Sequence, residues 1–238
     1  MKSVIWYTRF ILCFIVTLPD RLKIKRIYKN QGVTGVRLFC HGIGLKHLGP
    51  LVLSTGSRIK ITGGEHIPKD ETVLFISNHQ SYFDLGIFLG LIDKPKAYIA
   101  KDSLKKAPVL SGWMDHMGCV FIQRDNIKQS AAAILEGIRR LEEGYSMVVF
   151  PEGTRSKSGQ MGEFKAGAFK LATKTQVPII PVTINGTYKI MEANHNKIKP
   201  ADVLVKIHPP VETKNLSREE ALKLPDKIRD IIAGGLRD

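Results

Sequence analysis

Short apolar runs alternate with segments of helical periodicity from about residue 58 onward. The apolar runs predict strands at 72–77, 97–100, 119–124, 146–150, 178–185 and 203–208. The periodic segments between them predict helices at 85–91, 130–143 and 164–175. A last helix is expected after Ser217, which forms a capping box with Glu220, and Pro225 should kink or restart that helix. This alternation predicts an α/β fold with a mostly parallel sheet flanked by helices.

Two longer apolar segments precede this region. Residues 4–18 are apolar apart from two threonines and an arginine, and as a helix they cover roughly 22 Å, short of the ~30 Å hydrocarbon core. We therefore expect this helix to embed in a membrane rather than span it. Residues 36–53 place leucine and valine at helical spacing with basic residues between them, which is typical of an interfacial helix. The chain is thus divided into N-terminal membrane-interface helices (1–57) and an α/β domain (58–238).

Two other interpretations of the N-terminal segments stay open. Both segments could be core helices of a soluble domain, because an apolar helix face fits a protein interior as well as a bilayer. The first segment also resembles a signal peptide, but residues 17–23 offer no small-x-small cleavage site. A signal peptide is therefore disfavoured.

Charge changes the picture of the N-terminal region. The net charge is +14, and residues 1–60 hold 11 Lys and Arg against the single acid Asp20, a balance of +10. Such a patch indicates binding to phosphate, either in nucleic acid or at an anionic bilayer surface. The adjacent apolar segments favour the bilayer. A non-catalytic basic module that binds membrane or nucleic acid is the alternative from a different functional class.

Composition narrows the remaining classes. A hydrophobic fraction of 43% with 24% charged residues is typical of a globular protein and argues against a polytopic membrane bundle. Three widely spaced cysteines form neither a disulfide framework nor a zinc pattern, which indicates a reducing compartment. We expect no metal and no cofactor.

His79 and Asp84 are the first candidates for chemistry. They flank a polar turn between a buried-looking strand and an apolar helix, where functional side chains often lie in α/β sheets. In a continuous helix, positions five apart do not face each other, so the pair can meet only across a turn. There Asp84 could accept a hydrogen bond from one imidazole nitrogen and leave the other as a general base. With seven histidines in the chain, however, such a spacing also arises readily by chance.

A second predicted strand, 146–150, is followed by the polar turn 151–155. Pro151 ends the strand, Gly153 permits a close backbone approach, and Arg155 supplies a planar donor suited to phosphate. A plain β-turn with a solvated arginine would have the same residues. The turn alone therefore does not decide between binding and structure.

Taken in order, four blocks resemble those of the lysophosphatidic acid acyltransferase family of the bacterial PlsC type. Four ordered blocks are far more specific than any one of them, and the resemblance covers about residues 60–210. The blocks read Asn78-His79-x-x-x-x-Asp84, Gly118-Cys-Val-Phe-Ile-Gln-Arg124, Phe150-Pro-Glu-Gly-Thr-Arg155 and Val177-Pro-Ile-Ile-Pro-Val182.

The resemblance implies roles for individual side chains. His79 would be the general base and Asp84 would orient it. The residues expected to hold the acceptor's glycerol phosphate are Lys101, Arg124, Glu152, Gly153, Thr154 and Arg155. Of the two arginines, Arg155 is the stronger candidate for direct phosphate contact. Lys101 resembles a basic residue that joins the phosphate site in some members of the family, and a solvated lysine is the alternative, since Lys105 and Lys106 lie nearby.

The implied reaction is direct transfer of a fatty acyl group from acyl-CoA or acyl carrier protein to the sn-2 hydroxyl of lysophosphatidic acid, giving phosphatidic acid. The expected partners are the anionic membrane surface and these two substrates, with no nucleic acid. The expected location is the cytoplasmic face of the cell membrane, bound in a monotopic or peripheral way, because the donor is a cytosolic thioester. Another lysophospholipid or glycerol 3-phosphate remains an alternative acceptor.

Overall fold

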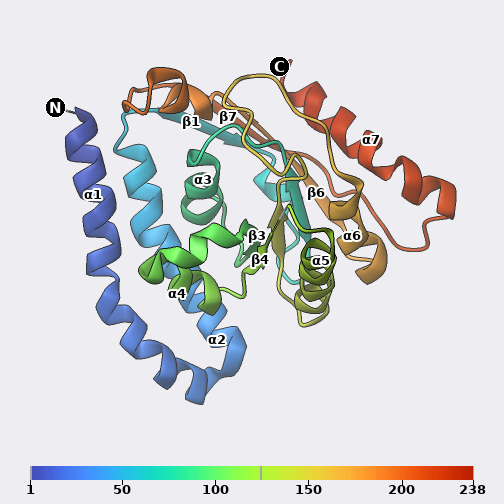
Figure 1. Ribbon diagram of the computed structural model, residues 1–238, viewed down its shortest axis with the longest axis horizontal. Coiled ribbons are helices and arrows are strands. Elements are labelled where there is room, and N and C mark those ends of the chain that lie inside the picture. The colour runs from blue at the N-terminus through green and yellow to red at the C-terminus, as the bar shows by residue number, and fades with distance from the viewer. Residues whose placement is uncertain (1, 124, 238) are drawn as a thin grey trace.

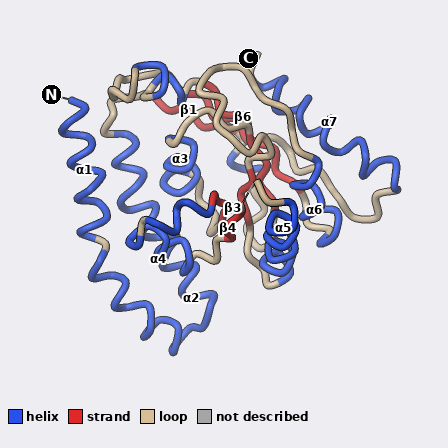
Figure 2. Tube along the Cα trace, in the orientation of Figure 1, coloured by secondary structure: helices blue, strands red, loops and turns tan. Residues whose placement is uncertain are grey.

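The computed structural model describes residues 2–123 and 125–237 and contains a central sheet with helices on both sides (Figures 1 and 2). Neighbouring strands are parallel except β6 and β7, which are antiparallel. The predicted fold class is therefore confirmed. Across the described part of the sheet the strand order is β1 (Arg58–Thr62), β7 (Asp202–Ile207), β6 (Ile179–Asn185), β2 (Leu74–Ser77), β5 (Met147–Val149), β3 (Ala97–Lys101) and β4 (Val120–Ile122).

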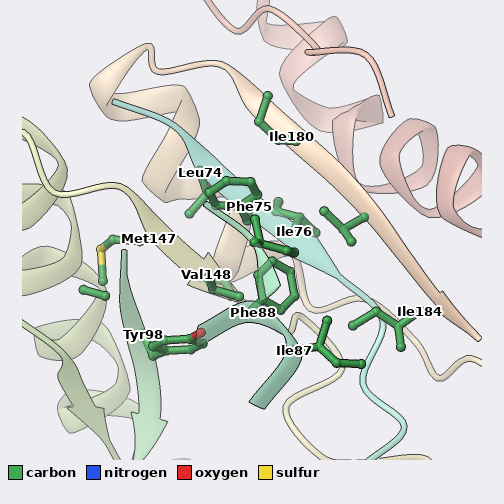
Figure 3. Packing of buried hydrophobic residues seen from close by; sticks show 14 of the residues in the cluster. Leu74, Phe75, Ile76, Ile87, Phe88, Tyr98, Met147, Val148, Ile180 and Ile184 are labelled. Atoms are coloured by element: carbon green, nitrogen blue, oxygen red, sulfur yellow. The ribbon is translucent and has the colours of Figure 1, made fainter. Parts of the chain in front are cut away.

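Strand β2 is the centre of the core. All four of its residues are buried because helices cover both faces of the sheet, which explains the apolar run of its first three residues. Figure 3 shows Leu74, Phe75 and Ile76 of this strand packed against side chains of neighbouring strands and of the helix that follows. The rings of Phe75 and Phe88 meet edge to face with centroids 5.8 Å apart. This rigid core fixes the carboxyl end of β2, where His79 follows.

The six predicted strands are present, with ends shifted by a few residues. One strand was missed: β1 alternates basic and apolar residues and pairs only with β7, at the edge of the sheet. An edge strand of five half-exposed residues has no buried run to reveal it. Arg124, at the end of the predicted strand 119–124, lies outside the described residues.

Helices after residue 58 largely follow the predicted pattern. They are α3 (Phe83–Leu91), α4 (Pro108–His116), α5 (Ile127–Glu142), α6 (Lys170–Thr175) and α7 (Arg218–Gly235), of which α4 was not predicted. Shorter 3₁₀ turns are η1 (Gly64–His66), η2 (Asp102–Lys106), η3 (Ala166–Phe169), η4 (Thr187–Lys189) and η5 (Glu192–Asn194). The Ser217–Glu220 capping box is confirmed, and α7 is one helix that contains Pro225, so of the two alternatives, a kink or a restart, the restart does not occur.

The predicted helix at 164–175 is half as long as expected. Its first part is extended chain and a 3₁₀ turn, because the Lys165 amide donates to the Pro151 carbonyl at 3.0 Å instead of entering a helix. This bond ties the chain before α6 to the polar turn after β5. The sequence pattern shows the apolar face but not this competing contact.

The N-terminal region is helical almost throughout. Helices α1 (Lys2–Val16) and α2 (Leu18–Leu53) include the two predicted segments and also residues 19–35, where no helix was predicted. Non-helical angles at Gly32 interrupt α2. Farther along, Gly49 lies so close to Gly90 of α3 that a Cβ on Gly49 would be 2.4 Å from the Gly90 carbonyl oxygen. The α2–α3 crossing therefore requires glycine, and α2 is part of the packed structure.

Helix α1 packs on one side and is open on the other. Trp6 is buried, and its indole N–H donates to the Leu51 carbonyl of α2 at 3.0 Å. By length and composition, the helical stretch Lys2–Leu53 is long and apolar enough to cross a membrane, a test that a signal sequence also passes, and 11% of its most apolar window is buried. The exposed apolar side chains of α1 are Val4, Ile5, Tyr7, Phe10, Ile11, Leu12, Ile15 and Val16.

Candidate active site

Three loops meet at the carboxyl ends of the central strands of the sheet. Strands β2, β5 and β6 are parallel neighbours, so the segments that follow their carboxyl ends lie together. These segments are residues 78–84, 150–156 and 186–192. Lys101 ends β3, the next strand beyond β5, and is exposed at the same edge. The structure therefore gathers His79, Asp84 and the turn at 152–155, while Arg124 lies outside the described residues.

His79 and Asp84 meet across the turn. His79 follows β2, Asp84 lies in the first turn of α3, and the distance from His79 Nδ1 to Asp84 Oδ2 is 2.7 Å. The same oxygen accepts the amides of Gln80 at 2.7 Å and Ser81 at 2.9 Å. An ionised carboxylate only accepts hydrogen bonds, so the imidazole proton lies on Nδ1 and Nε2 is the basic nitrogen.

Thr187 completes the surroundings of Asp84. Its hydroxyl donates to Asp84 Oδ1 at 2.6 Å, and both side chains are fully buried. Both carboxylate oxygens are thus satisfied, which a buried charge requires. Thr187 comes from η4, immediately after β6, and nothing in the sequence pattern connects it to a residue 103 positions earlier.

The His79 ring is held on its other side as well. It stacks on Phe150, with centroids 4.1 Å apart and planes at 18°. The His79 amide donates to Glu152 Oε1 at 2.7 Å. Only 11% of the side chain is exposed, and these contacts fix the orientation of the imidazole.

Glu152 acts within the loops. Besides the His79 amide, its carboxylate accepts the Gly162 amide at 2.9 Å. Burial raises the pKa of Glu152, and the two amide bonds offset part of that rise. A carboxylate engaged in this way supports the turn; direct contact with a phosphate would bring two negative groups together.

The remaining residues of the turn face outward. Gly153 adopts a φ of 71°, a left-handed conformation that favours glycine, and Thr154 is exposed. A Cβ built on Gly153 would lie 3.3 Å from Lys165 Nζ, so this lysine lies over the turn. Lys165 was not predicted as a site residue. Its position follows from the Pro151–Lys165 backbone bond, which the sequence does not reveal.

Arg155 lies in a defined position. Its guanidinium is 3.5 Å from the centroid of the Tyr82 ring, and Nη1 donates to Glu192 Oε1 at 2.9 Å. Glu192 is a second residue that sequence reasoning missed, since it comes from η5, 37 positions along the chain. The arrangement places the His79–Asp84 pair and a fixed guanidinium at the carboxyl ends of neighbouring strands.

Comparisons with known proteins show which family this chain belongs to. The family model described as Acyltransferase matches residues 58–185, more than half of the chain. A 1-acyl-sn-glycerol-3-phosphate acyltransferase of Borreliella burgdorferi is 36% identical over 74% of this chain and 71% of its own length. The chloroplastic 1-acyl-sn-glycerol-3-phosphate acyltransferase BAT2 of Brassica napus is 39% identical over 63% of this chain and 44% of its own length.

A solved structure extends the likeness to the whole chain. The crystal structure of the 1-acyl-sn-glycerophosphate acyltransferase PlsC from Thermotoga maritima superposes with a TM-score of 0.79 at 28% identity, covering 100% of this chain and 97% of that one. The match therefore includes the N-terminal helices as well as the sheet. This chain belongs to the acyltransferase family, with relatives among the 1-acyl-sn-glycerol-3-phosphate acyltransferases of the PlsC type.

Proposed function

We propose that this enzyme transfers a fatty acyl group from a thioester, acyl-CoA or acyl carrier protein, to the sn-2 hydroxyl of lysophosphatidic acid. The observation that carries the proposal is the 2.7 Å contact between His79 Nδ1 and Asp84 Oδ2 at the edge of the sheet where Arg155 also lies. The names of the matched relatives support the acceptor. The donor follows from the chemistry of a direct transfer and from the family resemblance.

His79 would act through Nε2. This nitrogen takes the proton of the acceptor hydroxyl while the hydroxyl oxygen attacks the thioester carbonyl carbon. The tetrahedral intermediate then collapses, the carbon–sulfur bond breaks, and the sulfur leaves with the proton from His79. Because thiolate is a good leaving group, the transfer needs no acyl-enzyme. Asp84 keeps Nδ1 protonated and stabilises the imidazolium that forms between the two steps.

Positive side chains near the base suit a phosphate monoester. Arg155 offers a planar fork of donors, and Lys165 lies over the same turn. Lys101 lies farther along the edge at the end of β3. We include Gly153 and Thr154 because they form the outer surface of the turn, whereas Glu152 serves by holding the turn in place.

We further propose that residues 1–57 bind the membrane and that 58–238 form the catalytic domain. The support is the exposed apolar side of α1 beside a surplus of basic residues. The active site would then face the cytoplasm, where the donor is found. Tyr7 of α1 also reaches the segment after β6, since its hydroxyl donates to the Asn196 carbonyl at 2.9 Å.

Thiol release from the donor tests the proposal. Purified protein in detergent is given acyl-CoA or acyl carrier protein thioester, with and without lysophosphatidic acid, and the free thiol is measured. We expect release that depends on the acceptor, with formation of phosphatidic acid. Release that is equal without acceptor would indicate a thioesterase and overturn the proposal.

A further inference from the structure

The carboxylate of Glu192 joins two of the three loops at the active site. Its Oε1 accepts Arg155 Nη1 at 2.9 Å and the Tyr82 amide at 3.1 Å, while its Oε2 accepts the Ser81 hydroxyl at 2.6 Å. Only 4% of the Glu192 side chain is exposed. One buried carboxylate therefore connects the turn after β2 with the turn after β5.

The contact with Glu192 fixes Arg155 but leaves several of its N–H donors without engaging them. A guanidinium has five N–H donors in one plane, and the bond to Glu192 engages Nη1. The Tyr82 ring, 3.5 Å from the guanidinium carbon, sets the plane. Donors on the remaining edge stay available to a ligand, in an orientation that the two contacts determine.

Glu192 is also connected to His79, through Ser81 and Asp84. Ser81, which donates its hydroxyl to Glu192, also donates its amide to the Asp84 carboxylate at 2.9 Å. Asp84 in turn holds the His79 imidazole. Glu192 and one short turn therefore determine the position of the Arg155 guanidinium relative to His79 Nε2.

We propose that Glu192 is a positioning residue that sets the separation between the base and Arg155, and thereby makes the enzyme selective for acceptors with a phosphate monoester. In lysophosphatidic acid a fixed number of bonds separates the phosphate from the free hydroxyl. A guanidinium held at one place brings that hydroxyl to the base only when the phosphate is present and bound. This inference rests on the proposed function.

The contacts argue against displacement of Glu192 by the phosphate. If a ligand took Arg155 away, the Glu192 carboxylate would stay buried without its positive partner, which is costly. Its other partners, a hydroxyl and an amide, hold it where it is. Glu192 also follows the 58–185 segment that matches the family model, so the match gives it no role.

Substrate selectivity tests the role of Glu192. Glu192→Gln keeps the shape of the side chain and removes its charge. The matched control is Glu163→Gln, the same substitution at an exposed residue of the neighbouring loop. Steady-state kinetics compare 1-acylglycerol 3-phosphate with 1-acylglycerol, which lacks the phosphate. For E192Q we expect KM for the phosphate acceptor to rise about tenfold and kcat to stay within about threefold, while 1-acylglycerol is used as before. E163Q should match the wild type.

A double-mutant cycle separates positioning from general stability. If Glu192 acts through Arg155, the roughly tenfold effect of E192Q should shrink to less than about twofold in an Arg155→Lys background. Additive effects in the cycle would overturn the proposal. Glu192→Asp, which keeps the charge with a shorter reach, should lie between wild type and E192Q; it also replaces E192Q if circular dichroism shows that E192Q is unfolded.

The outcomes distinguish this inference from the function on which it rests. A wild type that releases thiol without dependence on the acceptor overturns the proposed function, and the role of Glu192 falls with it. An active wild type with an unchanged KM in E192Q overturns only the role of Glu192. A loss of activity that is equal for both acceptors would likewise show that Glu192 has no part in phosphate selectivity.

Discussion

The Thr187 hydroxyl donates to the Asp84 carboxylate at 2.6 Å, and through it the segment after β6 contacts the His79–Asp84 pair. Asp84 and Thr187 are fully buried, so no water replaces this bond if it is lost. The surroundings of the His79–Asp84 pair thus include a residue outside every motif that the sequence displays.

Thr187→Val should slow the reaction without changing acceptor binding. The variant keeps the shape of the side chain and leaves Asp84 Oδ1 without its donor, so we expect kcat to fall about tenfold and the free energy of unfolding to fall by about 1–3 kcal/mol. Steady-state thiol release and denaturant unfolding measure the two effects. Thr187→Ser, which restores the hydroxyl, should recover most of both. Equal losses in Val and Ser variants would show that the hydroxyl has no role.

His79→Ala and Asp84→Asn should act mainly on kcat. Removing the base is expected to lower kcat by at least about 1,000-fold, and Asp84→Asn by about 100-fold or more because the amide no longer fixes the protonated Nδ1. KM for the acceptor should stay within about threefold, since Arg155 is untouched. Stopped assays with radiolabelled donor can follow such slow variants. Full activity in His79→Ala would exclude the proposed mechanism.

The two loops that carry these residues could be predicted because each begins where a buried strand ends. Polar residues directly after the runs at 72–77 and 146–150 have to lie at the carboxyl edge of a parallel sheet. Thr187 and Glu192 could not be found in this way. Their partners lie 103, 110 and 37 positions away, and only the packed fold brings them together. Single polar residues after a strand are too common to indicate such contacts.

Edge strands and closely packed glycines also could not be predicted from the hydrophobic pattern. Strand β1 escaped because an edge strand needs no continuous apolar run. The helical stretch from 19 to 35 is rich in charged residues and shows its inner face weakly, with Ile24 buried there. The crossing at Gly49 and Gly90 is invisible in a hydrophobic pattern, since its physical cause is the absence of a side chain.

Glu152→Gln should weaken the turn that holds His79. The Glu152 carboxylate accepts two backbone amides, and a glutamine would point an NH₂ group at one of them. We expect a loss of about 1–3 kcal/mol in the free energy of unfolding together with a lower kcat. Urea unfolding and thiol release measure the two effects. If Glu152 bound substrate instead, KM would rise and stability would stay unchanged. The exposed Glu163→Gln serves as control.

Because of Lys96, the free energy of unfolding should change with pH in the alkaline range. Its Nζ donates to the Phe88 and Ile92 carbonyls at the end of α3, and burial lowers its pKa from 10.5 to about 7. Between these values the unfolded chain binds the proton that the folded protein has lost, so stability rises with pH, by up to about 1.4 kcal/mol per pH unit. Lys96→Met should lack this slope. Urea unfolding at pH 7, 8 and 9 compares the two proteins, and equal slopes would contradict the assignment.

Point substitutions on α1 offer a sharper test of membrane binding than removal of the N-terminal region, because α2 packs against α3 at Gly49 and deletion would expose the core. Ile11 and Ile15 are 60% and 52% exposed. Replacing both with lysine should lower co-sedimentation with anionic vesicles about tenfold or more, since lysine is costly in the hydrocarbon region. The fold should remain intact, because neither side chain is buried.

The control for this experiment adds the same charge elsewhere. Leu135 and Leu222 are 67% and 71% exposed on α5 and α7, away from α1. Two added lysines there should leave binding unchanged or strengthen it slightly, because an anionic surface attracts positive charge. Weaker binding of the α1 variant despite its added positive charge would therefore identify apolar insertion as the cause. Equal binding of both variants would mean that electrostatic attraction alone holds the protein to the membrane and that the exposed face of α1 serves another contact.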